Sequence, residues 1–357
     1  NEEAEASKLI RQGLTMDLRS LNKEELNIVL KEWGLKSFRV NQIYDWFHVK
    51  LIRDYNEMTN VSKELRMRLN EEYPLNCIKI DRVQESRLDG TRKYLHRLSD
   101  GNYVESVFMR YRHGNSVCIS SQVGCKMGCR FCASTLDGFE RNLTPAEMLD
   151  QIYSITRDTG ERISNVVVMG TGEPMDNYDN VVKFYRLLTD ENGLNISGRN
   201  VTVSTCGIVP GIMKLAEENL TLTLALSLHA TTDEKRKELM PIANTYSIRE
   251  LMEACKTYFE KTGRRVSFEY ALVAGVNDTA TDAKELIALA REAKAHVNLI
   301  PVNPIKERDY RRGSREAIEA FKNSLEKNRI NCTIRREMGT DIDGACGQLR
   351  RRKLAEG

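Results

Sequence analysis

The sequence predicts an α/β protein: a parallel sheet covered by helices, preceded by a helical module and a small antiparallel β extension. Three observations support this class. Helical patterns occupy residues 1–75, the apolar period changes to two near residue 78, and apolar runs alternate with amphipathic segments from residue 113 onward. Regular βα alternation is typical of an open doubly wound sheet or of a full or partial barrel.

Helix caps and apolar faces define the N-terminal module, residues 1–75. Asn22 followed by Glu25 is a helix-start signal, and Gly34 can end that helix. A second helix is expected around Ile43, and a third begins near Ser62. We therefore expect three short helices before the first strand.

Two turn signals define the β extension at residues 76–112. Asp89-Gly90 and Asp100-Gly101 separate segments in which apolar and polar residues alternate. The expected strands cover residues 78–87, 91–98 and 103–111.

Residues 113–340 are expected to form the α/β core. Its strands are predicted at residues 116–120, 165–169, 201–204, 221–227, 266–272, 296–301 and 332–336. Capping boxes at Thr144 to Glu147 and at Ser247 to Glu250 begin two of the intervening helices. Both sheet arrangements place active-site residues after the C-terminal ends of strands.

Three cysteines, Cys125, Cys129 and Cys132, follow the first core strand with the spacing C-x₃-C-x₂-C. Cysteine sulfur is the ligand of [4Fe–4S] clusters, and three thiolates would leave the fourth iron open for a reacting molecule. A zinc module is a weaker interpretation, because zinc ligands normally come as two pairs. A cluster-bearing RNA-binding or electron-transfer protein without turnover is the alternative from a different functional class.

Gly170-Thr171-Gly172-Glu173-Pro174 follows the next predicted strand. The glycines would let a ligand approach the backbone, and the carboxylate could accept from an ammonium group. Alone, this is a weak pattern that also fits an ordinary strand-to-helix turn. Because this motif lies one βα unit after the cysteine loop, it is the expected neighbour of an amino acid bound to the open iron.

These two motifs resemble the radical S-adenosylmethionine superfamily and, within it, the RlmN/Cfr family of adenine methyltransferases. Further segments carry the resemblance: residues 116–132, 203–205, 227–230, 297–304 and 341–349. The resemblance covers almost the entire chain and implies a partial (βα)₆ barrel of the TIM type. It also implies four parts: an RNA-binding module at 1–75, the β extension at 76–112, the barrel at 113–340, and a tail loop at 341–357.

The resemblance implies two cofactors, one [4Fe–4S] cluster on the three cysteines and S-adenosylmethionine. The positions that match cofactor contacts of the family are Gly172, Glu173, Ser204, Ser227, Leu228, His229 and Asn303. By itself, His229 would be a satisfied histidine near a strand end.

Three further residues match catalytic positions of the family. Cys346 in the tail would carry the methyl group, Cys118 would resolve a protein–RNA crosslink, and Glu105 would take the ring proton. A buried core thiol is the ordinary interpretation of Cys118. The implied reaction is methylation of adenosine C2 in 23S rRNA, at the peptidyl-transferase centre, and beside the tRNA anticodon. C8 methylation is the alternative, and Pro174 favours C2.

The resemblance also implies an electron donor such as flavodoxin or ferredoxin, and a monomer. We expect no membrane contact, since no apolar run approaches the length of a membrane span. A thiolate-held cluster indicates the reducing cytoplasm. The net charge of +3 decides nothing about partners, but arginines cluster at 308–315, at 335–336 and at 350–352. These arginines would contact RNA phosphates, or they would only form solvated surface and part of a frayed tail.

Overall fold

The computed structural model describes residues 16–302, 310–342 and 347–356. Its centre is a ten-stranded sheet in the order β1-β2-β3-β4-β7-β8-β9-β10-β11-β12, beside a separate β5-β6 pair. The strands are β1 (Lys79–Glu85), β2 (Arg92–Arg97), β3 (Tyr103–Tyr111), β4 (Gly114–Cys118), β5 (Gln122–Gly124), β6 (Phe139–Asn142), β7 (Ile163–Val168), β8 (Val201–Thr205), β9 (Thr223–Ser227), β10 (Ser267–Leu272), β11 (His296–Pro301) and β12 (Cys332–Ile334).

The sheet changes direction at β4. Strands β1 to β4 pair antiparallel, and every pairing from β4 to β12 is parallel. The β extension therefore continues into the parallel part as one sheet. The predicted α/β class is confirmed.

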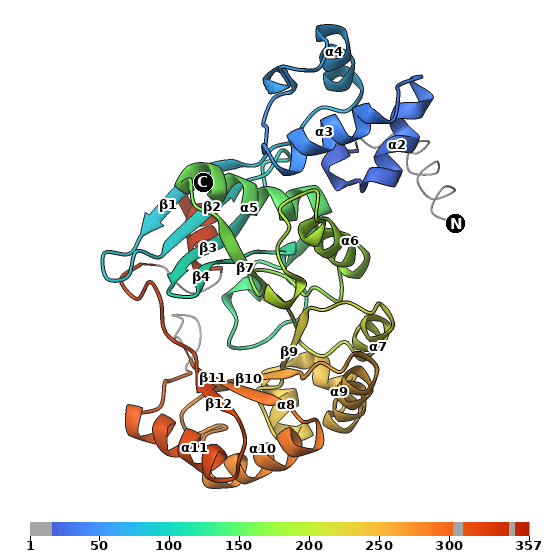
Figure 1. Ribbon diagram of the computed structural model, residues 1–357. Coiled ribbons are helices and arrows are strands. Elements are labelled where there is room, and N and C mark those ends of the chain that lie inside the picture. The colour runs from blue at the N-terminus through green and yellow to red at the C-terminus, as the bar shows by residue number, and fades with distance from the viewer. Residues whose placement is uncertain (1–15, 303–309, 343–346, 357) are drawn as a thin grey trace.

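Helices surround this sheet. They are α2 (Lys23–Glu32), α3 (Phe38–His48), α4 (Lys63–Glu72), α5 (Pro145–Thr159), α6 (Tyr178–Thr189), α7 (Val209–Glu217), α8 (Asp233–Leu239), α9 (Ile248–Thr262), α10 (Ala280–Glu292), α11 (Arg315–Lys327) and α12 (Gln348–Glu356). Short 3₁₀ helices are η1 (Leu18–Ser20), η2 (Tyr55–Glu57), η3 (Ala133–Thr135), η4 (Gly198–Asn200) and η5 (Pro241–Asn244). Figure 1 shows α2 to α4 at one end of the molecule and α10 and α11 at the other. None of the described helices combines the length and apolar character needed to cross a membrane.

Local sequence explains where several helices begin. The predicted capping boxes form at Asn22 and Glu25, at Thr144 and Glu147, and at Ser247 and Glu250. In each box the side-chain oxygen of the cap residue accepts from the backbone N–H of the third helical residue. The carboxylate of that third residue accepts in turn from the backbone N–H of the cap residue. These predictions are confirmed.

The N-terminal helices share a core with the rest of the molecule. Leu26 of α2, Val166 of β7 and Leu325 of α11 belong to one continuous cluster of buried apolar residues. Polar contacts add to this junction, since Arg19 lies 3.2 Å from the buried carboxylate of Asp150 on α5. The helical module is thus packed firmly onto the α/β core.

Three elements, β5, β6 and α12, were absent from the sequence prediction. The short strands β5 and β6 pair on either side of the cysteine loop. Residues 348–356 form helix α12, whereas the sequence predicted a loop over 341–357. The apolar residues of α12 are few, so tertiary contacts rather than an amphipathic pattern must hold it.

Candidate active site

The loop that carries the three cysteines is held at both ends. Cys125 directly follows β5, and its backbone N–H donates to the Gly138 carbonyl at 2.8 Å. Gly124 has a φ of +75°, and a β carbon there would collide with the same carbonyl. Farther along, the Arg130 N–H donates to the Leu239 carbonyl at 2.9 Å. The loop is therefore fastened to β6 and to the end of α8.

The three thiols lie near one another in a largely buried environment. Cys125 and Cys129 are 7% and 8% exposed, and Cys132 is half-buried. Burial raises the pKa of Cys125 to about 12, and the neighbouring Cys132 thiolate adds to the rise. Burial and then Cys132 raise the pKa of Cys129 as well. Metal binding would therefore have to displace protons from these thiols.

Three cysteines on one loop match the protein ligands of a [4Fe–4S] cluster with one open iron. Within the described residues, no three His, Cys, Asp or Glu side chains are grouped around one metal-ion position. Three cysteines of a [4Fe–4S] cluster each bind a different iron, so their sulfurs need not converge on one point. Cys125, Cys129 and Cys132 supply three sulfurs from a single fastened loop.

Glu173 follows β7 and supplies a buried carboxylate that is 3% exposed. It accepts from the backbone N–H of Cys206 at 2.7 Å and from that of Met175 at 3.0 Å. Burial raises the pKa of Glu173, although these hydrogen bonds act in the opposite direction. A cationic ligand beside Glu173 would favour its charged form, because an opposite charge nearby lowers the pKa of a carboxyl group.

Two glycines of the same turn pack against the protein itself. A β carbon at Gly170 would lie 2.6 Å from the Ile119 carbonyl oxygen, and one at Gly172 would lie 2.7 Å from the Gln122 β carbon. Gln122 also accepts from the Glu173 N–H at 2.8 Å. The sequence predicted that these glycines admit a ligand. In the structure they allow the close approach of Ile119 and of Gln122, the first residue of β5, and this packing fixes the position of Glu173.

The predicted cofactor residues of the next strands also lie at strand ends. Ser204 on β8 and Ser227 on β9 have their hydroxyl oxygens 3.4 Å apart. Leu228 is fully buried and donates its N–H to the Glu269 carbonyl at 3.0 Å. The structure therefore brings these three residues together at one edge of the sheet.

His229 is fixed in one protonation state. Its Nδ1 accepts from the Ala271 N–H at 2.9 Å, and burial lowers the pKa of His229 to about 3. The ring is therefore neutral, with its proton on Nε2. The Phe131 ring, from the cysteine loop, packs edge-on with its centroid 4.7 Å away. This contact joins His229 to the loop.

Lys93, Glu105 and Cys118 share one face of the sheet. In the register, Lys93 lies opposite Val107, and Val107 lies opposite Cys118. Directly paired residues point to the same face, as does Glu105, two positions from Val107. The Nζ of Lys93 lies 3.0 Å from the Glu105 carboxylate, and both side chains are buried. Sequence reasoning missed Lys93, because nothing in its strand distinguishes it.

The tail docks on the same face. Glu105 accepts from the backbone N–H of Gly347 at 2.7 Å and of Arg350 at 2.6 Å. Arg350 is 4% exposed and lies 3.7 Å from Asp137, just after the cysteine loop. A frayed tail is therefore excluded for this part. The predicted residues Cys346 and Asn303 lie outside the described residues.

Arg236 is a second buried cation that the sequence did not reveal. It is fully buried on α8 and donates to the carbonyls of Cys206 at 2.5 Å and Leu228 at 3.2 Å. It thus fixes two loops that carry or adjoin predicted cofactor residues. Its sequence context, a short polar helix, resembles any solvated surface.

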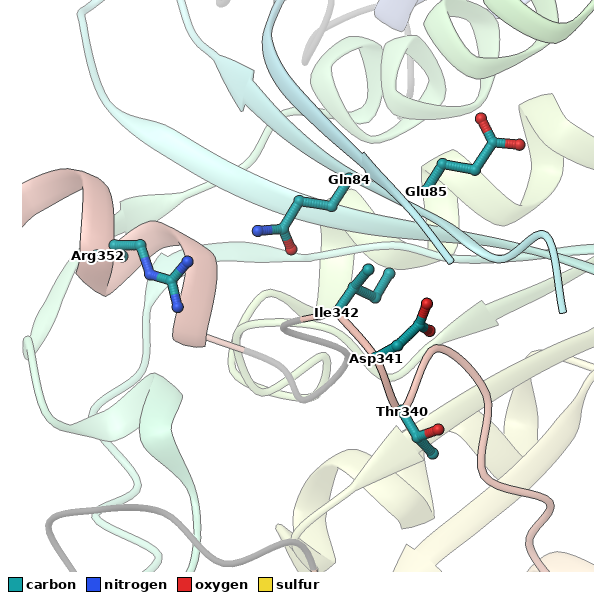
Figure 2. A pocket seen from close by; sticks show the side chains of 6 residues that line it. All are labelled: Gln84, Glu85, Thr340, Asp341, Ile342 and Arg352. Carbon is teal, nitrogen blue, oxygen red and sulfur yellow. The ribbon is translucent and has the colours of Figure 1, made fainter. Parts of the chain in front are cut away.

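A cavity of about 470 Å³ lies apart from these residues. It is lined by Gln84, Glu85, Thr340, Asp341, Ile342 and Arg352. Figure 2 shows that they come from β1, from residues 340–342 at the start of the tail and from α12. The lining contains no predicted cluster or cofactor residue from the described part of the chain.

Comparison with known proteins supports the same organisation. Residues 119–290 match the model of the radical SAM superfamily, and residues 16–74 match that of the ribosomal RNA large subunit methyltransferase N-terminal domain. The chain is 64% identical over 336 residues to "Probable dual-specificity RNA methyltransferase RlmN" of Lachnoclostridium phytofermentans, with 94% of each chain covered. The protein of the same name from Clostridium botulinum (strain Alaska E43 / Type E3) is 55% identical over 328 residues, covering 92% and 94%.

A solved structure extends the similarity to three dimensions. The crystal structure of a radical SAM methyltransferase from Sphaerobacter thermophilus superimposes with a TM-score of 0.89 at 42% identity. It covers 93% of this chain and 98% of the other. The chain therefore belongs to the RlmN family of radical SAM RNA methyltransferases.

Proposed function

We propose that this protein methylates C2 of an adenosine in 23S rRNA, at the peptidyl-transferase centre, and of the adenosine beside the tRNA anticodon. Relatives named dual-specificity RNA methyltransferases support the substrate class. The observation that carries the proposal is the shared sheet face: Glu105 contacts the docked tail, and Cys118 lies on the same face of the neighbouring strand. That face adjoins the cysteine loop, since a β carbon at Gly347 would lie 2.9 Å from the Ser134 nitrogen.

Two cofactors have fitting residues. Cys125, Cys129 and Cys132 would hold a [4Fe–4S] cluster, and Glu173 would accept from the amino group of S-adenosylmethionine. Ser204, Ser227, Leu228, His229 and Asn303 would complete the site, with Gly172 setting the position of Glu173. When bound, the cluster and S-adenosylmethionine supply one-electron chemistry that generates a carbon radical.

The low reactivity of adenine C2 is the reason why two further cysteines, Cys118 and Cys346, would be needed. This carbon lies between two ring nitrogens and is too electron-poor to attack a methyl electrophile. Instead, the methyl group would first be attached to the sulfur of Cys346. Removal of one hydrogen from this S-methyl group would give a carbon radical that can add to C2. Glu105 would take the ring proton, and the Cys118 thiol would release the RNA from the tail cysteine. Glu105 and Cys118 are both buried on the face of β3 and β4, which keeps water away from them.

C2 is preferred over C8 because Pro174 follows Gly172-Glu173, the form that resembles C2-methylating members of the family. For RNA binding we propose the N-terminal module, residues 1–75, followed by the extension at 76–112, the barrel at 113–340 and the tail at 341–357. A monomer in the cytoplasm, reduced by flavodoxin or ferredoxin, completes the proposal.

Nucleoside mass spectrometry tests this function. Protein with its cluster is incubated with reductant, S-adenosylmethionine and either 23S rRNA or tRNA, and wild type is compared with Cys346→Ala. We expect 2-methyladenosine from the wild type only. Formation of 8-methyladenosine would transfer the protein to the C8 activity. Absence of any methylated adenosine, with the cluster verified, would favour a cluster-bearing binding protein.

A further inference from the structure

The start of helix α12 has an unusual cap. Gly347 directly precedes the first helical residue, and Arg350 is the third residue of the helix. Their N–H groups have no acceptor within an α-helix, because they belong to its first turn. Here both donate to one carboxylate, to Oε2 of Glu105 from Gly347 and to Oε1 from Arg350.

A capping box normally meets this need from within the helix. The cap side chain accepts from the third residue, and the third residue's carboxylate accepts from the cap. In α12 the cap position is glycine and the third residue is arginine, so neither can accept. Glu105, more than 240 positions earlier in the chain, performs both roles from β3. The carboxylate thereby acts as a cap supplied by a distant strand.

Lys93 neutralises this carboxylate. Its side chain is fully buried, and its Nζ lies 3.0 Å from Oε2 of Glu105, which is 4% exposed. A buried carboxylate without a counter-ion is costly, and Lys93 supplies that counter-charge beside Glu105 beneath the tail. An ionised acceptor also forms the stronger hydrogen bonds with the two tail amides.

The docked tail has little freedom to shift. Gly347 has a φ of +82°, and a β carbon there would lie 2.9 Å from the Ser134 nitrogen in η3. This 3₁₀ helix directly follows Cys132. Gly347 is therefore packed closely between Glu105 and the end of the cysteine loop.

We propose that the buried Lys93–Glu105 pair is the docking point of the tail and that Lys93 is a positioning residue for the start of α12, which follows Cys346 in the sequence. The docking stands on the contacts above, whereas its consequence for methylation rests on the proposed function. Because Glu105 is covered by the docked tail, it can accept a proton from RNA only after the tail has moved. Glu105 would therefore cap α12 when the tail is docked and accept the ring proton when the tail has moved away.

Hydrogen–deuterium exchange at single amides tests the docking. The full chain with its cluster is compared as wild type, Lys93→Met, Lys93→Arg and the double variant Lys93→Met with Glu105→Gln. In the wild type we expect protection at the Gly347 and Arg350 amides, which a freely exposed helix start would leave unprotected. Lys93→Met should increase their exchange rates by about tenfold or more. Lys93→Arg should retain much of the protection.

The double variant and a control address misfolding. The double variant removes both buried charges, so it should fold even where Lys93→Met alone is unstable, and it should still lose protection at the two amides. Glu356→Gln breaks an exposed ion pair with Arg82 at the other end of α12 and should leave both amides protected. Near-UV circular dichroism establishes that each variant is folded.

Alkylation of Cys346, measured by peptide mass spectrometry, gives a second result. It should be faster in Lys93→Met and in the double variant than in the wild type. Wild-type amides without protection would overturn the proposal. So would protection that persists in folded Lys93→Met and in the double variant. Neither readout requires RNA or turnover, so a failure of the proposed methylation would be seen separately.

Discussion

Single residues set the geometry of the site through close packing. Gly172 combines a φ of +113° with a β-carbon position 2.7 Å from Gln122, so it is restricted both by conformation and by space. The sequence pattern identified this glycine but not its neighbour. Gln122 is distant in sequence and becomes visible only when β5 packs beside the turn.

Gly172→Ala should displace Glu173 and weaken binding of S-adenosylmethionine by about tenfold or more, because the alanine methyl group must move Gln122 and with it the turn. Equilibrium dialysis with labelled cofactor measures the affinity. Gly263→Ala is the matched control. Gly263 also has a positive φ, +67°, but a β carbon there meets nothing within 4 Å. Equal affinities in the two variants would show that space at Gly172 is unimportant.

Buried cations were the residues least accessible to sequence reasoning. Lys93 and Arg236 occur in segments with the charge content of ordinary surface elements. Their partners, Glu105 and the carbonyls of Cys206 and Leu228, come from other strands and loops. By contrast, the close spacing of Cys125, Cys129 and Cys132 made that set visible without a structure.

At the scale of elements, local signals predicted helices well. The capping boxes at Thr144 and Ser247 begin α5 and α9 as expected. The pair β5 and β6 was missed because each strand is too short to show alternation. Helix α12 was missed because its stability depends on Glu105 rather than on its own residues.

The junction of η1 and α5 depends on a buried charge network. Asp150 contacts Arg19 at 3.2 Å and Arg157 at 3.1 Å, and it accepts from the Ile78 N–H at 2.7 Å. Asp150→Asn should lower the free energy of unfolding by about 3–5 kcal/mol, since it leaves Arg157 without a carboxylate partner and the buried Arg19 with Asp17 alone. Urea unfolding followed by fluorescence measures this loss.

Glu253→Gln is the control for that network. It breaks the Arg249–Glu253 pair, whose side chains are 88% and 64% exposed. Exposed pairs contribute at most about 0.5 kcal/mol within a helix. A similar loss in both variants would mean that the Asp150 network has no special role.

The contact between α3 and α5 predicts a pH dependence. Burial lowers the pKa of His48 to about 3, and its ring lies 2.6 Å from the Tyr153 hydroxyl. Below pH ~6.5 the unfolded chain binds a proton at this histidine that the folded protein does not. The contribution of neutral His48 is therefore complete above pH ~6.5 and is lost as pH falls toward 3.

His48→Gln should make the stability loss on acidification less steep, by up to about 1.4 kcal/mol per pH unit between pH 6 and 4. Urea unfolding at several pH values gives the slope. His113→Gln, at an exposed ring, should leave the slope unchanged. An unchanged slope in His48→Gln would contradict burial of a neutral ring.

At the scale of the whole molecule, the sheet topology assembles the site. Strand β3 receives helix α12 from the far end of the chain, and β7 to β9 present Glu173, Ser204 and Ser227 along one edge. Sequence motifs predicted the order of these parts and the α/β class. They could not predict that the β extension and the parallel strands form one sheet, because no local pattern encodes the β3–β4 pairing.

The central claim is that a carbon from S-adenosylmethionine reaches adenine C2 through a thioether on the tail cysteine and not by direct methyl transfer. Cofactor with a fully deuterated methyl group, used with tRNA and followed by nucleoside mass spectrometry, tests this directly. Our account predicts 2-methyladenosine whose methyl group keeps two deuterium atoms, since one is removed before the carbon joins the base. A methyl group that keeps all three would contradict it.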